Sequence, residues 1–416
     1  MKILFLTALL LLQPLVSSAV IISYQHDVSG RLRSVNYNGT SRTDYAYDKN
    51  GSLLSRINSV TPPAAAAPQM AGNYNGLITH PSSNAGNTGI ISLKILANGT
   101  FSGKVTIQGI AYGFAGKFLA NGQLEGMNII IVRKAPLVNY TLALALDVTG
   151  SVPSISGTLS SEFEGNPFNS QVSLNPDIFN TGGQVIGNGL VGKYTLILQL
   201  GFGAGAPKGV SYATVSVSNK GAVTLAGKLA NNIAITQASQ IVGQNVWPLY
   251  VALHANKGYV AGNLKFYSPD FPGRTIGGFA SWLKPLTTGT FHPAAFAAIL
   301  NATGSLYLPP TVGQRIIDLN PVSPNAVFYA SEGNLAGPFH RNITIDAANK
   351  VTAPVDPVAL KLTLAAPTGV ISGTFKDGTI TRTLGGVFLQ DHLYGAGFFS
   401  GSTQSGKIEI EELLAP

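Results

Sequence analysis

The sequence predicts an all-β protein made of several antiparallel meander barrels or sandwiches in tandem, preceded by a short hairpin segment. Glycine is frequent, with 48 of 416 residues, and only 11% of the residues are charged. Polar positions are held by Ser, Thr, Asn and Gly rather than by the Glu, Lys and Ala that favour exposed helix faces. From residue 72 onward, apolar and polar residues alternate in runs between Gly- or Asn-bearing turns, which is typical of half-buried strands.

The first nineteen residues predict export. Lys2 supplies a positive charge, Ile3 to Leu12 form an apolar run broken only by Thr7, and small residues follow at 17–19. This order is that of a secretory signal peptide, and the run is too short to span a bilayer. No later segment approaches eighteen uninterrupted apolar residues, so we expect no transmembrane helix. The predicted location is secreted or on a bacterial cell surface.

Cysteine is absent, which excludes disulfides, a thiol nucleophile and thiolate metal sites. The protein must therefore be stabilised by core size or by strand pairing, and 416 residues are enough for two or three cores. The formal charge of +8 is modest and its Lys and Arg residues are scattered. A nucleic-acid groove would concentrate them beside stacking aromatics, so the excess indicates at most a weak attraction to acidic glycans or surfaces.

A short repeat opens the predicted mature chain. Tyr24, Asp27, Gly30, Leu32 and Ser34 recur as the same residue types 21 positions later. The pattern predicts a strand, a tight turn and a strand, in which Asp accepts backbone hydrogen bonds, Gly takes a positive φ, and Tyr and Leu pack on one face.

At these residues the segment 22–58 resembles the YD (Rhs-type) repeat of secreted and surface bacterial proteins. In that family many repeats form a large β shell. Two copies are too few to close one, because each repeat buries its apolar face only against neighbours. We therefore expect a remnant, a hairpin added to something larger, or a flexible arm.

The stretch from Thr61 to Pro68, TPPAAAAP, reads as a semi-rigid linker. Close spacing of the later strands favours a meander, and the lack of helical crossovers disfavours a parallel α/β sheet. The one helix expected is Pro293 to Leu300. The predicted divisions are a signal peptide at 1–19, the repeat segment at 20–60, a linker at 61–71, and β modules at 72–180, 181–288 and 289–416.

A tetrad of a small residue, Gly, any residue and an apolar residue recurs through the modules. Gly inside a strand usually marks a bulge, a bend or a close approach of two backbones, so the tetrads predict strongly curled sheets. They are Ser102–Val105, Ala115–Phe118, Ser156–Leu159, Ala226–Leu229, Ala261–Leu264, Ser372–Phe375 and Ser405–Ile408.

Residues 72–413 also resemble an uncharacterised all-β region of large exported proteins from environmental bacteria. That resemblance implies an export-associated β domain and no established activity. The segments that carry it are Gly192–Leu196, Trp247–Tyr250, Ala280–Pro285, Gly385–Gln390, and Gly395–Gly401 with Gln404–Gly406.

Catalytic sets are weak in this sequence. Asp391-His392 lies near Ser400, Ser402 and Ser405, but the serines occupy a Gly-rich turn without a nucleophile elbow. Glu162 and Glu164 would share one strand face as a surface acidic patch rather than flank a sugar. The six histidines are scattered without ligand spacing. We expect no catalytic residue, no metal site and no cofactor.

The candidate ligand-binding residues are Trp247, Tyr250 and Trp282, because exposed aromatic rings stack on sugars. Their apolar neighbours favour core packing instead.

The leading hypothesis is a non-enzymatic, secreted or surface β protein in attachment, matrix building or ligand binding, with surface glycans or surface proteins as candidate partners. The first alternative is a polysaccharide-active enzyme or a carbohydrate-binding module. The second is an outer-membrane β-barrel, which the missing terminal aromatic and the lack of aromatic girdles disfavour.

Overall fold

The structure, a computed structural model, describes residues 22–27, 29–37, 41–48, 50–60, 70–82, 84–133, 139–149, 152–163, 165–177, 189–267, 275–353 and 356–413. The predicted signal peptide lies outside these residues, as does most of the predicted linker. The chain divides into two compact units, Met1–Ala64 and Ala65–Pro416.

The first unit is a four-stranded antiparallel sheet of β1 (Ile22–His26), β2 (Leu32–Tyr37), β3 (Ser41–Tyr47) and β4 (Leu53–Val60), in chain order. Its two end turns are alike and confirm the turn chemistry predicted from the repeat. The Oδ1 of Asp27 accepts the backbone N–H groups two and four residues later at 2.9 and 3.0 Å, and Asp48 does the same at 2.9 and 2.8 Å. Gly30 and Gly51 take φ of 78° and 89°, a region that Gly occupies without strain.

The packing of this sheet is thinner than predicted. Tyr24 is 59% exposed and Leu53 is 54% exposed, although the repeat predicts that Tyr and Leu pack on one face. The reason is that a single sheet has no second layer against which to bury them.

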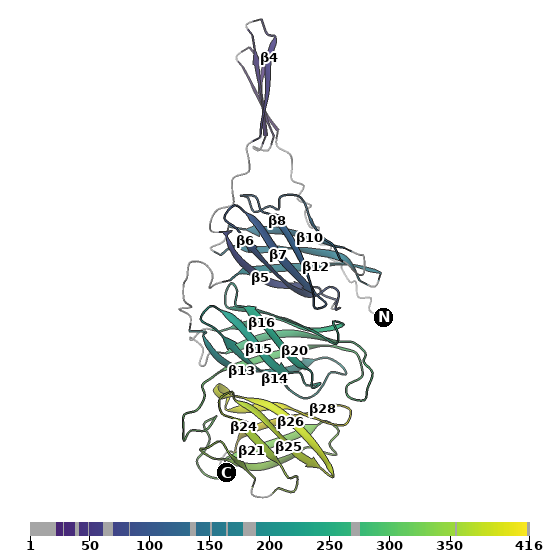
Figure 1. Cartoon of the computed structure of the whole chain (residues 1–416), viewed down its shortest axis with the longest axis vertical. Helices are drawn as coiled ribbons and strands as arrows, with labels where there is room; N and C mark the ends of the chain where they lie inside the picture. The colour runs from purple at the N-terminus through teal and green to yellow at the C-terminus, as the bar shows by residue number, and fades with distance from the viewer. Residues whose placement is uncertain are drawn as a thin grey trace, which may run out of the picture. The chain divides into compact units, whose positions relative to one another are not determined.

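The second unit holds three eight-stranded antiparallel sheets in tandem, each curled into a nearly closed barrel, which confirms the predicted fold class (Figure 1). The first barrel contains β5 (Gly72–Thr79), β6 (Gly89–Ile95), β7 (Thr100–Ile107), β8 (Ile110–Lys117), β9 (Ile129–Ile131), β10 (Tyr140–Asp147), β11 (Ser154–Phe163) and β12 (Asn166–Pro176). The second contains β13 (Gly192–Phe202), β14 (Ser211–Val217), β15 (Ala222–Lys228), β16 (Ala234–Gln240), β17 (Val246–Leu253), β18 (Gly258–Phe266), β19 (Ile276–Lys284) and β20 (Phe296–Tyr307). The third contains β21 (Ala326–Glu332), β22 (Phe339–Ile345), β23 (Val351–Thr352), β24 (Lys361–Ala365), β25 (Val370–Asp377), β26 (Ile380–Leu389), β27 (Tyr394–Ser400) and β28 (Ser405–Glu412).

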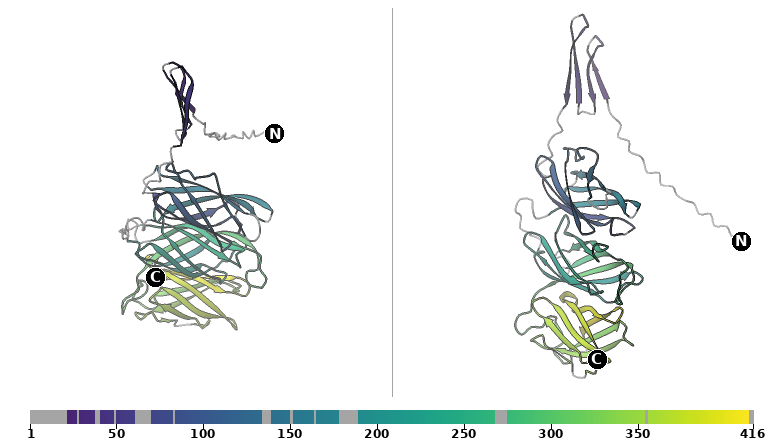
Figure 2. Two further views of the ribbon diagram at one scale, coloured as in Figure 1. Left: turned by 45° about the horizontal axis from the view of Figure 1, so that its top comes forward. Right: turned by 45° about the vertical axis from the view of Figure 1, so that its right-hand side comes forward.

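Each barrel is an up-and-down meander whose first strand pairs with its last, as in β5–β12, β13–β20 and β21–β28. The seam of each barrel therefore lies in mid-sequence, between β8 and β9, β16 and β17, and β23 and β24. Isolated bridges span these seams, such as Val242 with Val246 and Lys350 with Thr363. Figure 2 shows the curled sheets from two further sides.

Two expectations fail at the same strand. Residues Pro293 to Leu300 do not form a helix, because Phe296–Tyr307 is the long strand β20 with a strictly alternating start. β20 also belongs to the second barrel, where it pairs with β13 and β19. The expected boundary near residue 288 thus cut the second barrel before the strand that closes it.

The barrel interiors are filled by alternate side chains. In β10, Tyr140, Leu142, Leu144 and Leu146 are buried while the residues between them are only half-buried. Tight curling also needs the Gly residues of the tetrads, because a methyl group added to Gly157 would lie 2.0 Å from the carbonyl oxygen of Ala143. The predicted close backbone approach is confirmed there.

The barrels pack on one another through their outer faces. Leu77 of β5 and Ile90 of β6 pack with Tyr250, Tyr259 and Ala261 of the second barrel. These contacts bury one side of β5, β17 and β18 from outside, so those strands lose the alternation that a solvated face would give.

The second and third barrels meet in the same manner. Ile197 of β13 and Tyr212 of β14 pack with a cluster that includes Val387 of β26. The Oγ1 of Thr195 donates a hydrogen bond of 2.6 Å to the backbone oxygen of Phe388. This face of the second barrel is thereby covered.

Candidate functional site

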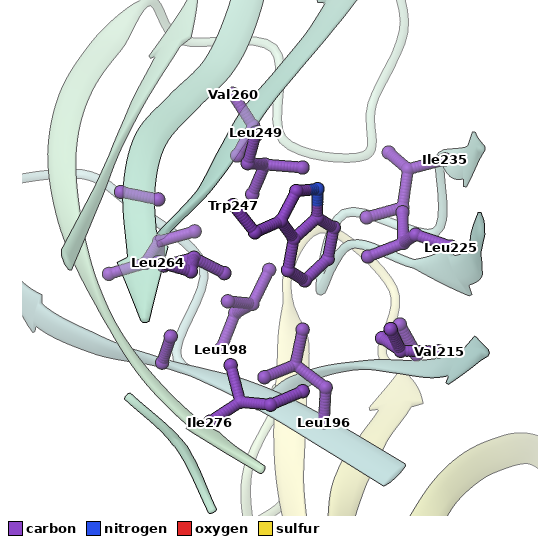
Figure 3. Packing of buried hydrophobic residues seen from close by; sticks show 14 of the residues in the cluster. Leu196, Leu198, Val215, Leu225, Ile235, Trp247, Leu249, Val260, Leu264 and Ile276 are labelled. Atoms are coloured by element: carbon purple, nitrogen blue, oxygen red, sulfur yellow. The ribbon is translucent and has the colours of Figure 1, made fainter. Parts of the chain in front are cut away.

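The three aromatic residues considered as ligand-binding candidates are buried, as their apolar neighbours indicated. Trp247 is 0% exposed and Trp282 is 1% exposed, both inside the second barrel. Figure 3 shows Trp247 enclosed by aliphatic side chains that include Leu225, Leu249 and Leu264. Its Nε1 donates to the Oε1 of Gln237 at 3.1 Å.

Tyr250 lies at the contact between the first two barrels and is 7% exposed. Its ring stacks on that of Tyr259, with centroids 6.3 Å apart. None of the three rings offers a face to solvent, so they do not form a sugar-stacking platform. The physical cause for Trp247 and Tyr250 is that β17 is buried on both sides, by the second barrel's core and by the first barrel, while Trp282 of β19 packs in the same core.

The Asp-His-Ser set considered in the sequence is not assembled. Asp391 and His392 lie in the short 3₁₀ helix η2 (Gln390–His392), which has no buried residue. Ser402 accepts a hydrogen bond of 3.2 Å from Arg382 instead. Ser405 is fully buried beside a different histidine, His292.

The contact of His292 and Ser405 is structural in its geometry. The Nε2 of His292 accepts the backbone N–H of Ser405 at 2.8 Å and lies 3.3 Å from its Oγ. Because that lone pair is occupied, the imidazole is not placed to take a proton from the hydroxyl. Burial, and then the nearby charge of Lys284, lower the pKa of His292 to about 4. The contact joins the loop before β20 to the hairpin that starts β28.

The acidic residues do not converge either. Glu162 is exposed on β11, and Glu164 lies outside the described residues. Glu409 forms an ion pair of 2.6 Å with Lys407. Among the residues that the structure describes, no group of three or more His, Asp or Glu side chains is placed to hold a metal ion. In the same residues, no helix has the length and hydropathy needed to cross a bilayer.

A polar groove of about 380 Å³ lies on the outer face of the first barrel. Cross-strand pairing sets its layout, since Asn73 pairs with Lys94 and Lys94 pairs with Ser102, while Asn75 pairs with Ser92 and Ser92 with Lys104. These side chains point outward because they alternate with core residues along β5, β6 and β7. The polar residues that line it are Asn73, Asn75, Ser92, Lys94, Ser102, Lys104 and Asp177.

The groove continues into a second hollow of about 430 Å³ between the first and second barrels. The two hollows share Asn75, Ser92 and Lys104. The wall from the second barrel is formed by Ala222, Ala238, Ser239 and Gln240. The Oε1 of Gln240 is buried and accepts no hydrogen bond from the part of the chain that the structure describes.

The junction beside the groove is fixed by hydrogen bonds. The Nδ2 of Asn75 donates to the Oδ1 of Asp177 at 2.6 Å, which holds this buried carboxylate in place. The backbone N–H of Gly243 donates to the oxygen of Pro176 at 2.9 Å, from the second barrel to the first. The two walls are therefore held at a set separation.

The electrostatics of the groove favour an anion. Lys94 and Lys104 are exposed, and neither forms an ion pair with a residue that the structure describes. As diagonal neighbours on paired strands, their backbones lie about 7 Å apart. Against these two positive charges stands the one buried carboxylate of Asp177. Amide, hydroxyl and ammonium groups in one groove can bind a hydroxylated, acidic ligand.

The groove was not identified from the sequence. The alternation in β6 and β7 places Ser92, Lys94, Ser102 and Lys104 outside the barrel, and this signal is readable. The missing information is that the second barrel stands beside this face, because its wall comes from residues more than a hundred positions away.

An outer-membrane barrel carries apolar residues outside. In the first barrel the buried interior is apolar, while the outer face of β6 and β7 carries Ser92, Lys94, Ser102 and Lys104. On these two strands the polarity is the opposite of that expected for the outer-membrane alternative.

No family model matches this chain, and no curated protein matches it. Solved structures similar to it include transferrin-binding protein B from Haemophilus parasuis Hp5, at 9% identity and a TM-score of 0.22, covering 95% of this chain and 86% of that one. Transferrin-binding protein B from serogroup B Neisseria meningitidis is 11% identical with a TM-score of 0.21, covering 91% and 84%. A protein of unknown function from Nostoc punctiforme is 11% identical with a TM-score of 0.16, covering 57% of this chain and 97% of its own. TM-scores this low carry no argument about what this chain binds.

Proposed function

We propose that this chain is an exported, non-enzymatic binding protein of a bacterial cell exterior, and that the groove between its first and second barrels binds an acidic polysaccharide. The observation that carries the proposal is that the ammonium groups of Lys94 and Lys104, which form no ion pair with a described residue, lie in a groove of amides and hydroxyls.

The rest of the second unit supports a binding role on the outside of the barrels. The interior of the second barrel is filled by core side chains such as Trp247 and Trp282, which favours a binding surface outside it. The groove is open along the outer face, which suits a long polymer better than an enclosed small molecule.

The proposed chemistry assigns each part of the groove a partner. Lys94 and Lys104 pair with carboxylates on successive acidic sugars. Asn73, Ser92 and Ser102 exchange hydrogen bonds with sugar hydroxyls. The buried Oε1 of Gln240, which has no hydrogen-bond donor among the described residues, accepts a hydrogen bond from a sugar hydroxyl. The buried Asp177 orients Asn75.

The test is calorimetric titration of the mature chain with an oligogalacturonate and with a neutral cello-oligosaccharide of equal length. We expect binding of the acidic oligomer only. Each exposed ammonium contributes about 1 kcal/mol, so the double variant K94A/K104A should weaken binding by about tenfold to thirtyfold. The affinity should also fall as salt is raised.

A matched control removes two exposed lysines of the third barrel, in K350A/K361A, with the same loss of net charge. This control should bind like the wild type. Equal binding of acidic and neutral oligomers, or equal weakening by the two double variants, would refute recognition by the groove. Absence of binding to any acidic polysaccharide in a screen, with capture of a surface protein instead, would overturn the assigned ligand class.

A further inference from the structure

In the two contacts between barrels, the earlier barrel uses equivalent positions of its first hairpin. Leu77 and Ile90 form the second cross-strand pair from the turn between β5 and β6. Ile197 and Tyr212 form the second pair from the turn between β13 and β14. Both pairs lie on the outer face, and Leu77 and Ile197 are 3% and 4% exposed because the following barrel covers them. We name this position the forward face.

The covering side uses corresponding strands in the two barrels, with the covering pairs four residues apart in register. The second barrel uses the pair Tyr250–Ala261 on β17 and β18, and the third barrel uses Val370–Val387 on β25 and β26. β17 and β25 lie three strands before the last strand of their barrel, and β18 and β26 lie two strands before it. We name the outer face of these two strands the rear face.

Each kind of face occurs once more, at positions that the described residues of the second unit leave exposed. In the third barrel the forward position holds Tyr329–His340, again the pair next to the last, with the two rings 6.1 Å apart. Tyr329 is 39% exposed, in contrast to its two buried counterparts. On the second strand of this hairpin His340 supplies an aromatic ring, as Tyr212 does on the second strand of the equivalent hairpin.

In the first barrel the rear position holds Ile130–Thr141 on β9 and β10. Ile130 is 56% exposed, and the nearby Met127 and Val132 are also exposed. The residues that follow Thr141 on this outer face are small, Ala143 and Ala145. A flat face with exposed apolar side chains is what the covered rear faces offer to Leu77 and Ile197.

We propose that the forward face of the third barrel docks on the rear face of the first barrel of a second copy of this chain. The contact repeats the arrangement that joins the first barrel to the second within one copy, because Ile130–Thr141 holds the register of Tyr250–Ala261. Tyr329 would pack on Ile130, with Thr141 and Glu409 at a polar rim. Because the two faces differ, the contact is heterologous, and copies add head to tail without a two-fold axis.

Sedimentation velocity of the mature chain over a range of concentrations tests the proposal. The wild type should form a ladder of dimers and longer species as the concentration rises toward about 1 mM. I130D and Y329D should each remain monomeric alone, because every contact needs one face of each kind.

An equimolar mixture of I130D and Y329D gives the decisive result. I130D keeps an intact forward face and Y329D an intact rear face, so the mixture should form one-to-one dimers and nothing longer. I380D changes another exposed isoleucine of the third barrel and should associate like the wild type. Thermal unfolding checks that all variants fold.

A wild type that stays monomeric throughout the range would overturn the proposal. Association of I130D alone would show a contact between two forward faces, and association of Y329D alone a contact between two rear faces. Either would overturn it as well.

Discussion

Replacing Trp247 with Ala measures how much of the second barrel's stability depends on its filled interior. Trp247 has no exposed surface and packs against Phe266, with ring centroids 6.1 Å apart. Truncating a buried Trp to Ala costs about 3–5 kcal/mol through lost burial and the cavity left behind. The Oε1 of Gln237 also loses the indole donor, which adds about 1 kcal/mol. The free energy of unfolding should therefore fall by about 4–6 kcal/mol.

Urea unfolding followed by tryptophan fluorescence isolates this effect. The chain has two tryptophans, both in the second barrel, so Trp282 alone reports that barrel in W247A. The matched control is F279A, since Phe279 is an aromatic residue of the same barrel that is 68% exposed. It should change stability by no more than about 0.5 kcal/mol. Loss of less than 1 kcal/mol in W247A, or equal losses in both variants, would refute a core role for Trp247.

Three further outcomes follow from the packing. The pKa of His292 in the folded chain, about 4, lies below the ordinary value of 6.5, so the unfolded chain binds more protons between these pH values. The free energy of unfolding should therefore fall by about 3 kcal/mol as the pH drops from 6.5 to 4. In urea melts over this pH range, H292N should show a smaller fall. In the same melts, G157A should lower the free energy of unfolding by about 1–3 kcal/mol, because its methyl group meets a backbone oxygen. The control G113A adds a methyl group that meets nothing within 4 Å and should lower it less. Equal losses in the two variants would contradict the close approach at Gly157. T195V should lose about 1 kcal/mol, since it removes the hydrogen bond to Phe388 between the second and third barrels; an unchanged melting temperature would show that this bond is not needed.

The sequence predicted the fold class from local patterns, and local patterns determine it. Alternation in segments such as Tyr140–Asp147 places side chains inside or outside without reference to distant residues. The turns at Asp27 and Asp48 were predictable for the same reason, because their hydrogen bonds stay within five residues. The resemblance to YD repeats stays a prediction.

The candidate site and the last strand of the second barrel were not predictable in that way. PAAFAAIL has the composition of a helix, and only pairing with β13 and β19 makes its second half a strand. The apolar neighbours of Trp247 and Tyr250 favoured core packing, whereas the cover that the first barrel gives to Tyr250 is not specified by neighbouring residues. The groove needs two barrels side by side, which no local pattern specifies.

Hydrogen exchange of the mature chain with and without an acidic oligosaccharide tests most directly whether ligands bind outside the barrels. We expect slower exchange in residues 89–106 and 234–243, which form the two walls of the groove, and little change in β17 and β19, the strands that carry Trp247 and Trp282. Protection confined to β17 and β19, or protection elsewhere that leaves both walls of the groove unchanged, would contradict the account.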